Sequence, residues 1–183
     1  MRQKVVGIAV LIFLALAVQA SEFEKDIFKT SNGNLEITFL GHGTLMMEFD
    51  GKVVHIDPVG NFADYASLPK ADLILITHEH GDHLDPKSID LLKKETTEIV
   101  LTQICSEKYK GTAVLKNGES ASFLGLKIEA VPAYNIKNLR GDGKPFHPKG
   151  AGNGYVIYFA DKKVYVAGDT ENIPEMKNLQ DID

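Results

Sequence analysis

Three histidines and two acidic residues occur within the seven residues 77–83, Thr-His-Glu-His-Gly-Asp-His. Residues 71–76 before them form an apolar run without alternation, which predicts a strand buried on both faces. Asp85 and Pro86, just after them, are typical of the N-cap and the first position of a helix. The histidine-rich segment is therefore expected to be a short loop between a buried strand and a helix, where open α/β sheets build their sites.

Imidazole nitrogens and carboxylate oxygens at this density are typical ligands of zinc and, less selectively, of iron or manganese. The alternative is a polar loop of solvated histidines. His78 and His80 are two residues apart, and Asp82 and His83 follow directly, so several ligands converge if the loop folds around an ion. We therefore expect these four residues to form a metal site.

The pattern His-x-His-x-Asp-His also resembles the signature of the metallo-β-lactamase superfamily. The resemblance implies an α/β (α+β) fold, the αββα sandwich, and a hydrolase that binds two zinc ions. It places His78 and His80 at the first ion and Asp82 and His83 at the second. Asp169, in Gly-Asp-Thr at an expected strand end, matches the superfamily's bridging carboxylate, although this tripeptide is also ordinary turn chemistry.

Two features depart from the superfamily pattern. Many members carry a further histidine where this chain has Tyr134-Asn135, and His147 is the one histidine left in the interval, either a ligand or a surface-loop residue. A last histidine normally lies well beyond the bridging aspartate, so we expect the domain to be incomplete at its C-terminal end. Pro-Ala-Tyr-Asn, His-Pro-Lys and Gly-Tyr-Val-Ile resemble an uncharacterised zinc-dependent hydrolase branch, UPF0173, which is similar to ascorbate-6-phosphate lactonases.

Other polar residues near expected strand ends are candidates for supporting roles. His42 lies between two glycines and is expected to be a proton donor, a substrate contact or a turn residue. Asp82 is also expected to orient the nucleophile or take its proton. Asp57 is expected to accept a hydrogen bond from a ligand imidazole or from the metal loop, or to be a cap. His55, inside a strand, and Cys105 are expected to be structural.

The rest of the chain predicts sheets covered by helices in one domain, residues 21–183. A hairpin at Asp50-Gly51 is expected between strands, and a helix is expected from Pro86 to about Lys93. Residues 21–34 are polar, with a turn signal at Asn32-Gly33-Asn34, and residues 135–154 are expected to be irregular. The expected strands are 35–40, 44–49, 52–57, 99–101, 114–115, 120–123, 126–131, 155–160 and 163–167, with a second short helix at 106–110.

Residues 1–20 have the pattern of a signal peptide: Arg2 and Lys4, an apolar core at 5–18, and a small-residue cleavage site before Ser21. An uncleaved anchor is the alternative. We therefore expect an exported protein, periplasmic or secreted, with no stable membrane insertion after cleavage. The net charge of −5 and the absence of a basic stripe argue against nucleic acid and leave a small-molecule substrate.

These features together favour hydrolysis by a zinc-activated water or hydroxide on an ester-type bond, a lactone or a phosphodiester. No Gly-x-Ser-x-Gly elbow competes with this mechanism. The alternatives are an exported β-lactamase and a non-hydrolytic metal-binding or redox protein on the same scaffold. The missing histidine near residue 134 favours the last of these.

Overall fold

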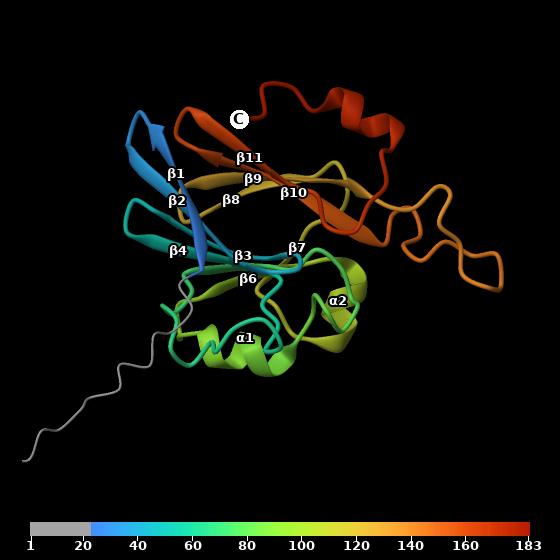
Figure 1. Cartoon of the computed structure of the whole chain (residues 1–183), viewed down its shortest axis with the longest axis horizontal. Helices are drawn as coiled ribbons and strands as arrows, with labels where there is room; N and C mark the ends of the chain where they lie inside the picture. Colours follow the sequence, from blue (N-terminus) through green and yellow to red (C-terminus); the bar gives the residue numbers. More distant parts are fainter. Residues whose placement is uncertain (1–22) are drawn as a thin grey trace, which may run out of the picture.

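The computed structural model describes residues 23–183 and consists of two β-sheets that face each other (Figure 1). The expected signal peptide, residues 1–20, lies outside the described residues. One sheet has the strand order β1(Glu24–Thr30), β2(Gly33–Gly41), β3(Thr44–Phe49), β4(Lys52–Ile56), β5(Leu73–Leu75), β6(Glu98–Leu101) and β7(Ala113–Val114). The other has the order β11(Lys162–Val166), β10(Gly152–Phe159), β9(Leu126–Ala133) and β8(Ser120–Phe123).

Helices α1(Pro86–Leu92) and α2(Gln103–Lys108) lie on the outer face of the seven-stranded sheet, and the 3-10 helix η1(Pro174–Asn178) lies over the other sheet (Figure 1). No helix in residues 23–183 is both long enough and apolar enough to cross a membrane. One apolar core fills the space between the two sheets, and a second lies between the seven-stranded sheet and helices α1 and α2. The seven-stranded sheet is therefore buried on both faces, as the predicted αββα sandwich requires.

The strand–loop–helix unit around residues 71–92 has the predicted form. The side chains of β5 are fully buried, alternating between the two cores. Asp85 is the N-cap of α1 and accepts a hydrogen bond from the backbone N–H of Lys87, and Pro86 opens the helix. At the hairpin after β3, Asp50 and Gly51 both have positive φ, 49° and 71°, which suits the tight turn predicted there.

Two elements differ from the prediction. Residues 24–30 form β1, paired antiparallel with β2, where no strand was expected, and the turn signal at residues 32–34 lies where these two strands join. Six of the seven β1 residues are exposed, so the strand lacks the apolar face on which a sequence pattern depends. The second helix begins at Gln103 rather than Ser106, because the Thr102 side chain caps it by accepting from the N–H of Cys105.

The two sheets meet beside the histidine-rich loop. The N–H of Asn153 donates to the carbonyl of Thr77 at 2.8 Å, and the Tyr155 hydroxyl donates to the carbonyl of Ile76 at 2.8 Å. Gly168, just after β11, has φ 61°, and a Cβ there would lie 3.0 Å from the Asn153 carbonyl oxygen. Only glycine fits this approach, which draws the end of β11 against the loop that follows β5.

Candidate metal centre

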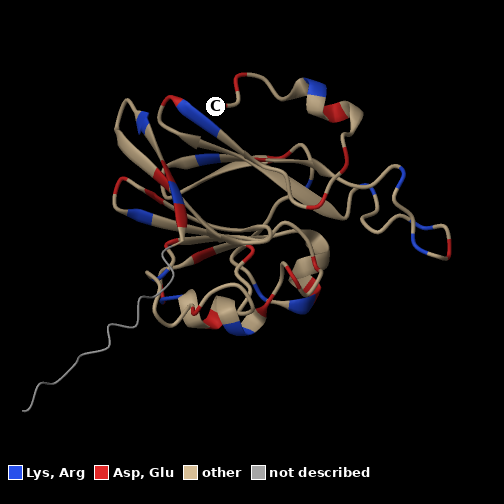
Figure 2. Cartoon of the chain, in the orientation of Figure 1, with Lys and Arg blue, Asp and Glu red and all other residues tan. Residues whose placement is uncertain are grey.

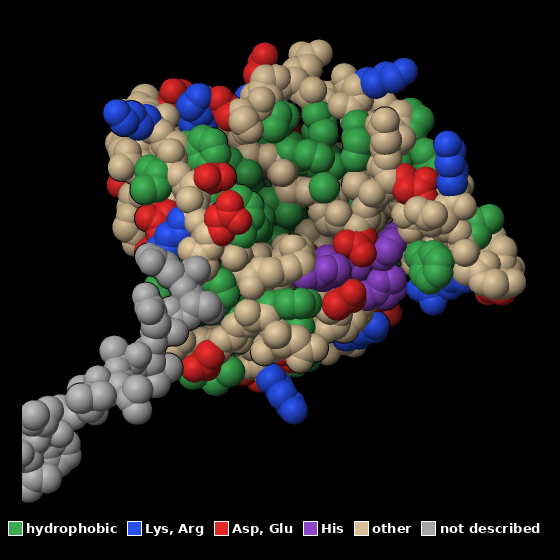
Figure 3. Space-filling model, viewed as in Figure 1, with side chains coloured by type: hydrophobic (Ala, Val, Ile, Leu, Met, Phe, Trp, Pro, Cys, Tyr) green, Lys and Arg blue, Asp and Glu red, His purple; other side chains and the backbone are tan. Residues whose placement is uncertain are grey.

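Five histidines and two aspartates converge at the edge where the two sheets meet, and in space-filling view the histidines form one cluster flanked by acidic side chains (Figure 3). They come from the turn after β2, from residues 78–83, from the long connection between β9 and β10, and from the segment after β11. Their ligand atoms fall into three groups whose members lie within 4.8 Å of one another: His78, His80 and His147; His42, His83 and Asp169; and His78, Asp82 and His83.

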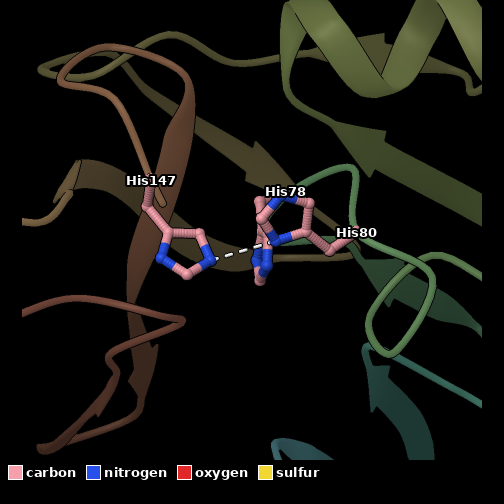
Figure 4. A group of neighbouring side chains, drawn as sticks. All are labelled: His78, His80 and His147. Carbon is pink, nitrogen blue, oxygen red and sulfur yellow. Dashed lines mark hydrogen bonds between the residues drawn. The ribbon is translucent and has the colours of Figure 1, made fainter. Parts of the chain in front are cut away.

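The first group joins the histidine-rich loop to the distant His147 (Figure 4). Nε2 of His147 lies 3.0 Å from Nδ1 of His80, and the two ring centroids are 4.7 Å apart. The ring of His78 meets both others edge-on, with centroids 4.8 Å away in each case. Three imidazoles that turn nitrogens toward one point are arranged as a cation would require.

Asp169 lies between the groups with one carboxylate oxygen toward each. Its Oδ1 lies 3.2 Å from Nε2 of His83, and its Oδ2 lies 3.4 Å from Nε2 of His147 and 4.0 Å from Nε2 of His78. The sequence resemblance predicts a bridging role for this residue. A carboxylate that shares its two oxygens between neighbouring ions needs this orientation.

Two ring nitrogens at the site lack hydrogen-bond partners. Within residues 23–183, Nε2 of His78 and Nε2 of His83 are buried and make no hydrogen bond, although His83 lies close to Asp169. The two residues are only 3% and 1% exposed. Leaving a buried polar atom unpaired costs about 1–3 kcal/mol. A metal ion removes this cost, so the donor set fits a divalent cation.

Asp57 fixes the buried side of the site. Its carboxylate accepts from the N–H of Thr77 at 2.8 Å, from the Thr77 hydroxyl at 2.6 Å and from Nδ1 of His83 at 2.8 Å. Burial raises the pKa of Asp57, and the hydrogen bonds from His83 and Thr77 act in the opposite direction. The prediction that Asp57 accepts a hydrogen bond from an imidazole or from the histidine-rich loop is confirmed by its contacts with His83 and Thr77. Because Nδ1 of His83 donates to Asp57, Nε2 is the ring nitrogen that faces Asp169 and would serve a metal ion.

The histidines differ in their preference for a proton. Burial lowers the pKa of His78 to about 3, and the neighbouring His83 adds to this. Burial also acts to lower the pKa of His83, but the carboxylates of Asp169 and Asp57 outweigh it and raise this pKa to about 10. Contact with His83 holds the pKa of Asp169 well below its usual range. Positive charge is therefore favoured next to Asp169, which is also what a cation site needs.

Asp82 and His42 lie at the exposed side of the cluster. Nε2 of His42 lies 3.4 Å from Oδ2 of Asp82, and its ring stacks on Phe62 and meets His83 edge-on. His42 has φ 52°, a left-handed conformation that turns its ring toward the site. The sequence predicts a proton donor or substrate contact here. The geometry adds a third role that was missed, because His42 also belongs to a group of possible ligands with His83 and Asp169.

Two residues outside the predicted ligand set hold the connection containing His147, and neither was assigned this role from the sequence. Asn135 Oδ1 lies 2.7 Å from Nδ1 of His147 and also accepts from the His147 N–H, so it orients the ring. Glu171 accepts from three consecutive backbone N–H groups, residues 136–138, at 2.7–3.1 Å. No local motif identifies such partners, but Glu171 lies two residues after the predicted bridging Asp169.

The residues expected to be structural lie away from the cluster's ligand atoms. His55 is fully buried in β4 with Nε2 3.1 Å from the carbonyl of Pro69, and burial lowers its pKa to about 4. Cys105 is fully buried under the helices, and burial raises its pKa to about 11. Among the residues that the structure describes, neither belongs to a group that could hold a metal ion.

Comparison with known proteins finds the same superfamily that the histidine-rich motif resembles. Residues 36–183 match the family model described as the beta-lactamase superfamily domain. The chain is 31% identical over 155 residues to a UPF0173 metal-dependent hydrolase of Desulforamulus reducens, which covers 81% of this chain and 68% of the relative. It is 32% identical over 157 residues to UPF0173 metal-dependent hydrolase MK1542 of Methanopyrus kandleri, with 81% and 67% covered. The chain thus spans about two thirds of the length of these relatives.

Two solved structures that resemble this chain are also described as metal hydrolases. A crystal structure from Parabacteroides distasonis, provisionally named a metal-dependent hydrolase, is 50% identical and superposes with a TM-score of 0.83 over 88% of this chain and 73% of that one. Igni18, a metallo hydrolase from Ignicoccus hospitalis, is 24% identical, with a TM-score of 0.61 over 79% of this chain and 64% of that one, and shares the fold.

Proposed function

The chain belongs to the beta-lactamase superfamily domain family, and on this premise we propose that it is a zinc-dependent hydrolase that cleaves an ester-type bond, a lactone or a phosphodiester. The observation that carries the proposal is the convergence of His78, His80 and His147 with Asp169, together with buried ring nitrogens that lack hydrogen bonds. Nitrogen and carboxylate donors in this mixture suit zinc, with iron or manganese as alternatives.

We assign the residues to two neighbouring positions. His78, His80 and His147 would hold one ion and Asp82 and His83 the other, with Asp169 shared and His42 available to the second. When bound, zinc lowers the pKa of a coordinated water from 15.7 to about 7 and polarises the oxygen of the bond to be cleaved. Mixed imidazole and carboxylate ligands support a catalytic site, because structural zinc sites are usually closed by cysteines and histidines alone.

The chain's own residues supply orientation and proton transfer. Asp57 holds the His83 ring through Nδ1, and Asn135 holds the His147 ring in the same way. Asp82 is exposed and lies near His42, so this pair is placed to take a proton from the attacking water and return it to the leaving group. These positions are held before substrate arrives, so little reorganisation is needed during the reaction.

The non-hydrolytic alternative was favoured by the lack of a histidine near residue 134. His147 now lies 3.0 Å from His80, so that feature no longer distinguishes the two functions. We keep the small-molecule substrate as part of the proposal, along with export to a periplasm or out of the cell.

The test combines metal analysis with turnover. Purified protein is analysed for zinc, iron and manganese and assayed against a lactone, a 4-nitrophenyl phosphodiester and a cephalosporin, before and after treatment with a chelator. The proposal expects stoichiometric zinc, turnover of the lactone or the phosphodiester, and loss of turnover in the chelated protein and in His80→Ala. Bound metal with no turnover of any substrate would support the non-hydrolytic alternative, and turnover of the cephalosporin alone would support the β-lactamase.

A further inference from the structure

Arg140 is the one arginine in residues 23–183, and it reaches the candidate metal centre. Its Nη2 lies 3.2 Å from Nε2 of His80 and donates to the carbonyl of Phe146 at 3.2 Å. The guanidinium also lies over the Phe146 ring, 5.3 Å from its centroid. Within residues 23–183 it forms no ion pair with any carboxylate, whereas Lys144 and Lys149 of the same connection pair with Asp142 and Glu175.

The segment that carries Arg140 is a small hairpin rather than a free loop. Leu139 pairs with Pro145 in an isolated β-bridge, and the N–H of Arg140 donates to the carbonyl of Lys144 at 2.7 Å. Residues 136–150 contain four basic residues against one acidic residue, and Figure 2 shows such charges along the extension between β9 and β10. An open hollow of about 490 Å³ adjoins it, lined by Asn135, Lys137, Asn138, Leu139, Phe146 and His147.

The two nitrogens of His80 face different surroundings. Nδ1 faces His147 and the metal ligands, and Nε2 faces Arg140. If Nδ1 holds an ion, the ring's remaining hydrogen is on Nε2, so His80 becomes a donor toward Arg140. Two donors 3.2 Å apart repel unless an acceptor binds both. The space next to Nε2 of His80 and Nη2 of Arg140 therefore suits an oxygen atom of an anion.

We propose that Arg140 and Nε2 of His80 bind a free carboxylate or phosphate group of the substrate, so that the site prefers substrates with an anionic group outside the bond that is cleaved. This rests on the proposed hydrolytic function and specifies its substrate class. A guanidinium suits a planar two-oxygen group because its N–H donors form a rigid fork.

The test compares γ-butyrolactone-γ-carboxylate with the neutral γ-valerolactone, using zinc-loaded wild-type protein, Arg140→Gln and Lys144→Gln. Lys144→Gln removes the same charge from the same hairpin, but from a side chain paired with Asp142, and serves as the matched control. A hydrogen bond to a charged group corresponds to about a tenfold to hundredfold effect. We expect Arg140→Gln to reduce the ratio of kcat/KM for the anionic to the neutral lactone by that factor, and Lys144→Gln to leave the ratio unchanged.

A binding measurement separates this proposal from the proposed function. Glutarate, which cannot be hydrolysed, is titrated calorimetrically into the same three zinc-loaded proteins. We expect Arg140→Gln to bind it at least tenfold more weakly than wild-type protein and Lys144→Gln to match wild type, even if no lactone is hydrolysed. The proposal is overturned if Arg140→Gln keeps the substrate ratio and the glutarate affinity, or if both variants lose them equally.

Discussion

Replacing Asp57 by asparagine tests whether the buried side of the site is held by a charged acceptor. Asp57 has φ 44° and is 1% exposed. Asparagine tolerates the left-handed conformation better than other side chains, so the change removes the charge with little backbone strain. The amide can still accept from the N–H of Thr77, but its NH₂ group then faces the donors on Thr77 Oγ1 and His83 Nδ1.

The expected cost follows from those two lost bonds. At about 1.5 kcal/mol each for hydrogen bonds to a charged acceptor, the free energy of unfolding of the metal-free protein falls by about 3 kcal/mol. To restore one bond, His83 must move its proton from Nδ1 to Nε2, which removes the nitrogen that would bind metal. Zinc affinity is therefore expected to fall about 10- to 100-fold, as is usual when a hydrogen-bond partner of a metal ligand is lost.

The assays are urea unfolding of the metal-free protein and zinc competition with a chromophoric chelator. Asp50→Asn is the matched control, because Asp50 also has positive φ, 49°, but is exposed and pairs with Lys52 at 2.9 Å. This surface change is expected to alter stability by less than about 0.5 kcal/mol. If Asp57→Asn behaves like Asp50→Asn in both assays, the reasoning about the buried acceptor is refuted.

Three further changes test other parts of the site and core. Asn135→Ala should weaken zinc binding about tenfold with little loss of stability, because it frees the ring of His147; equal affinity would contradict the proposed orientation. Glu171→Gln should increase hydrogen exchange at the N–H groups of residues 136–138, because their charged acceptor is lost. Unchanged protection would show that Glu171 does not hold this segment. The His55 pKa is lowered to about 4, so the unfolded state binds more protons below pH 6.5 and stability falls as the pH falls from 7 to 5. This loss of stability between pH 7 and pH 5 is about 2 kcal/mol, and urea unfolding of His55→Leu should lack it. If wild-type protein and His55→Leu lose the same stability over this pH range, the assignment to His55 is refuted.

Local sequence patterns were sufficient to predict the strand–loop–helix unit at the centre of the fold and the hairpin before it. The apolar run before residue 77, the cap at Asp85 and the turn at Asp50-Gly51 each act within a few residues, and the structure has all three features. The hydrogen bonds of Asp57 were also predictable, since a carboxylate at a strand end next to a buried ligand loop has few other partners.

Non-local contacts account for what the sequence could not predict. The exposed β1 has its place only through pairing with β2. His147 lies 67 residues from His80 in the chain, and no periodicity indicates that the connection folds back to it. Glu171 binds only backbone N–H groups of that connection, and Asn135 binds one as well as the His147 ring. Every residue type carries a backbone N–H, so a motif does not encode such partners.

The histidines of the cluster are held with different rigidity, and this difference affects how a metal ion would enter and leave. His78 and His83 are buried and attached to the sheet through Thr77 and Asp57, so their nitrogens are positioned by the core itself. His80 and His147 are less buried, and His147 depends on the clamped connection between β9 and β10. Local opening takes place where few buried contacts oppose it. Exchange of metal and entry of substrate are therefore expected from the side of His147, beside Arg140, while the side of Asp57 stays fixed.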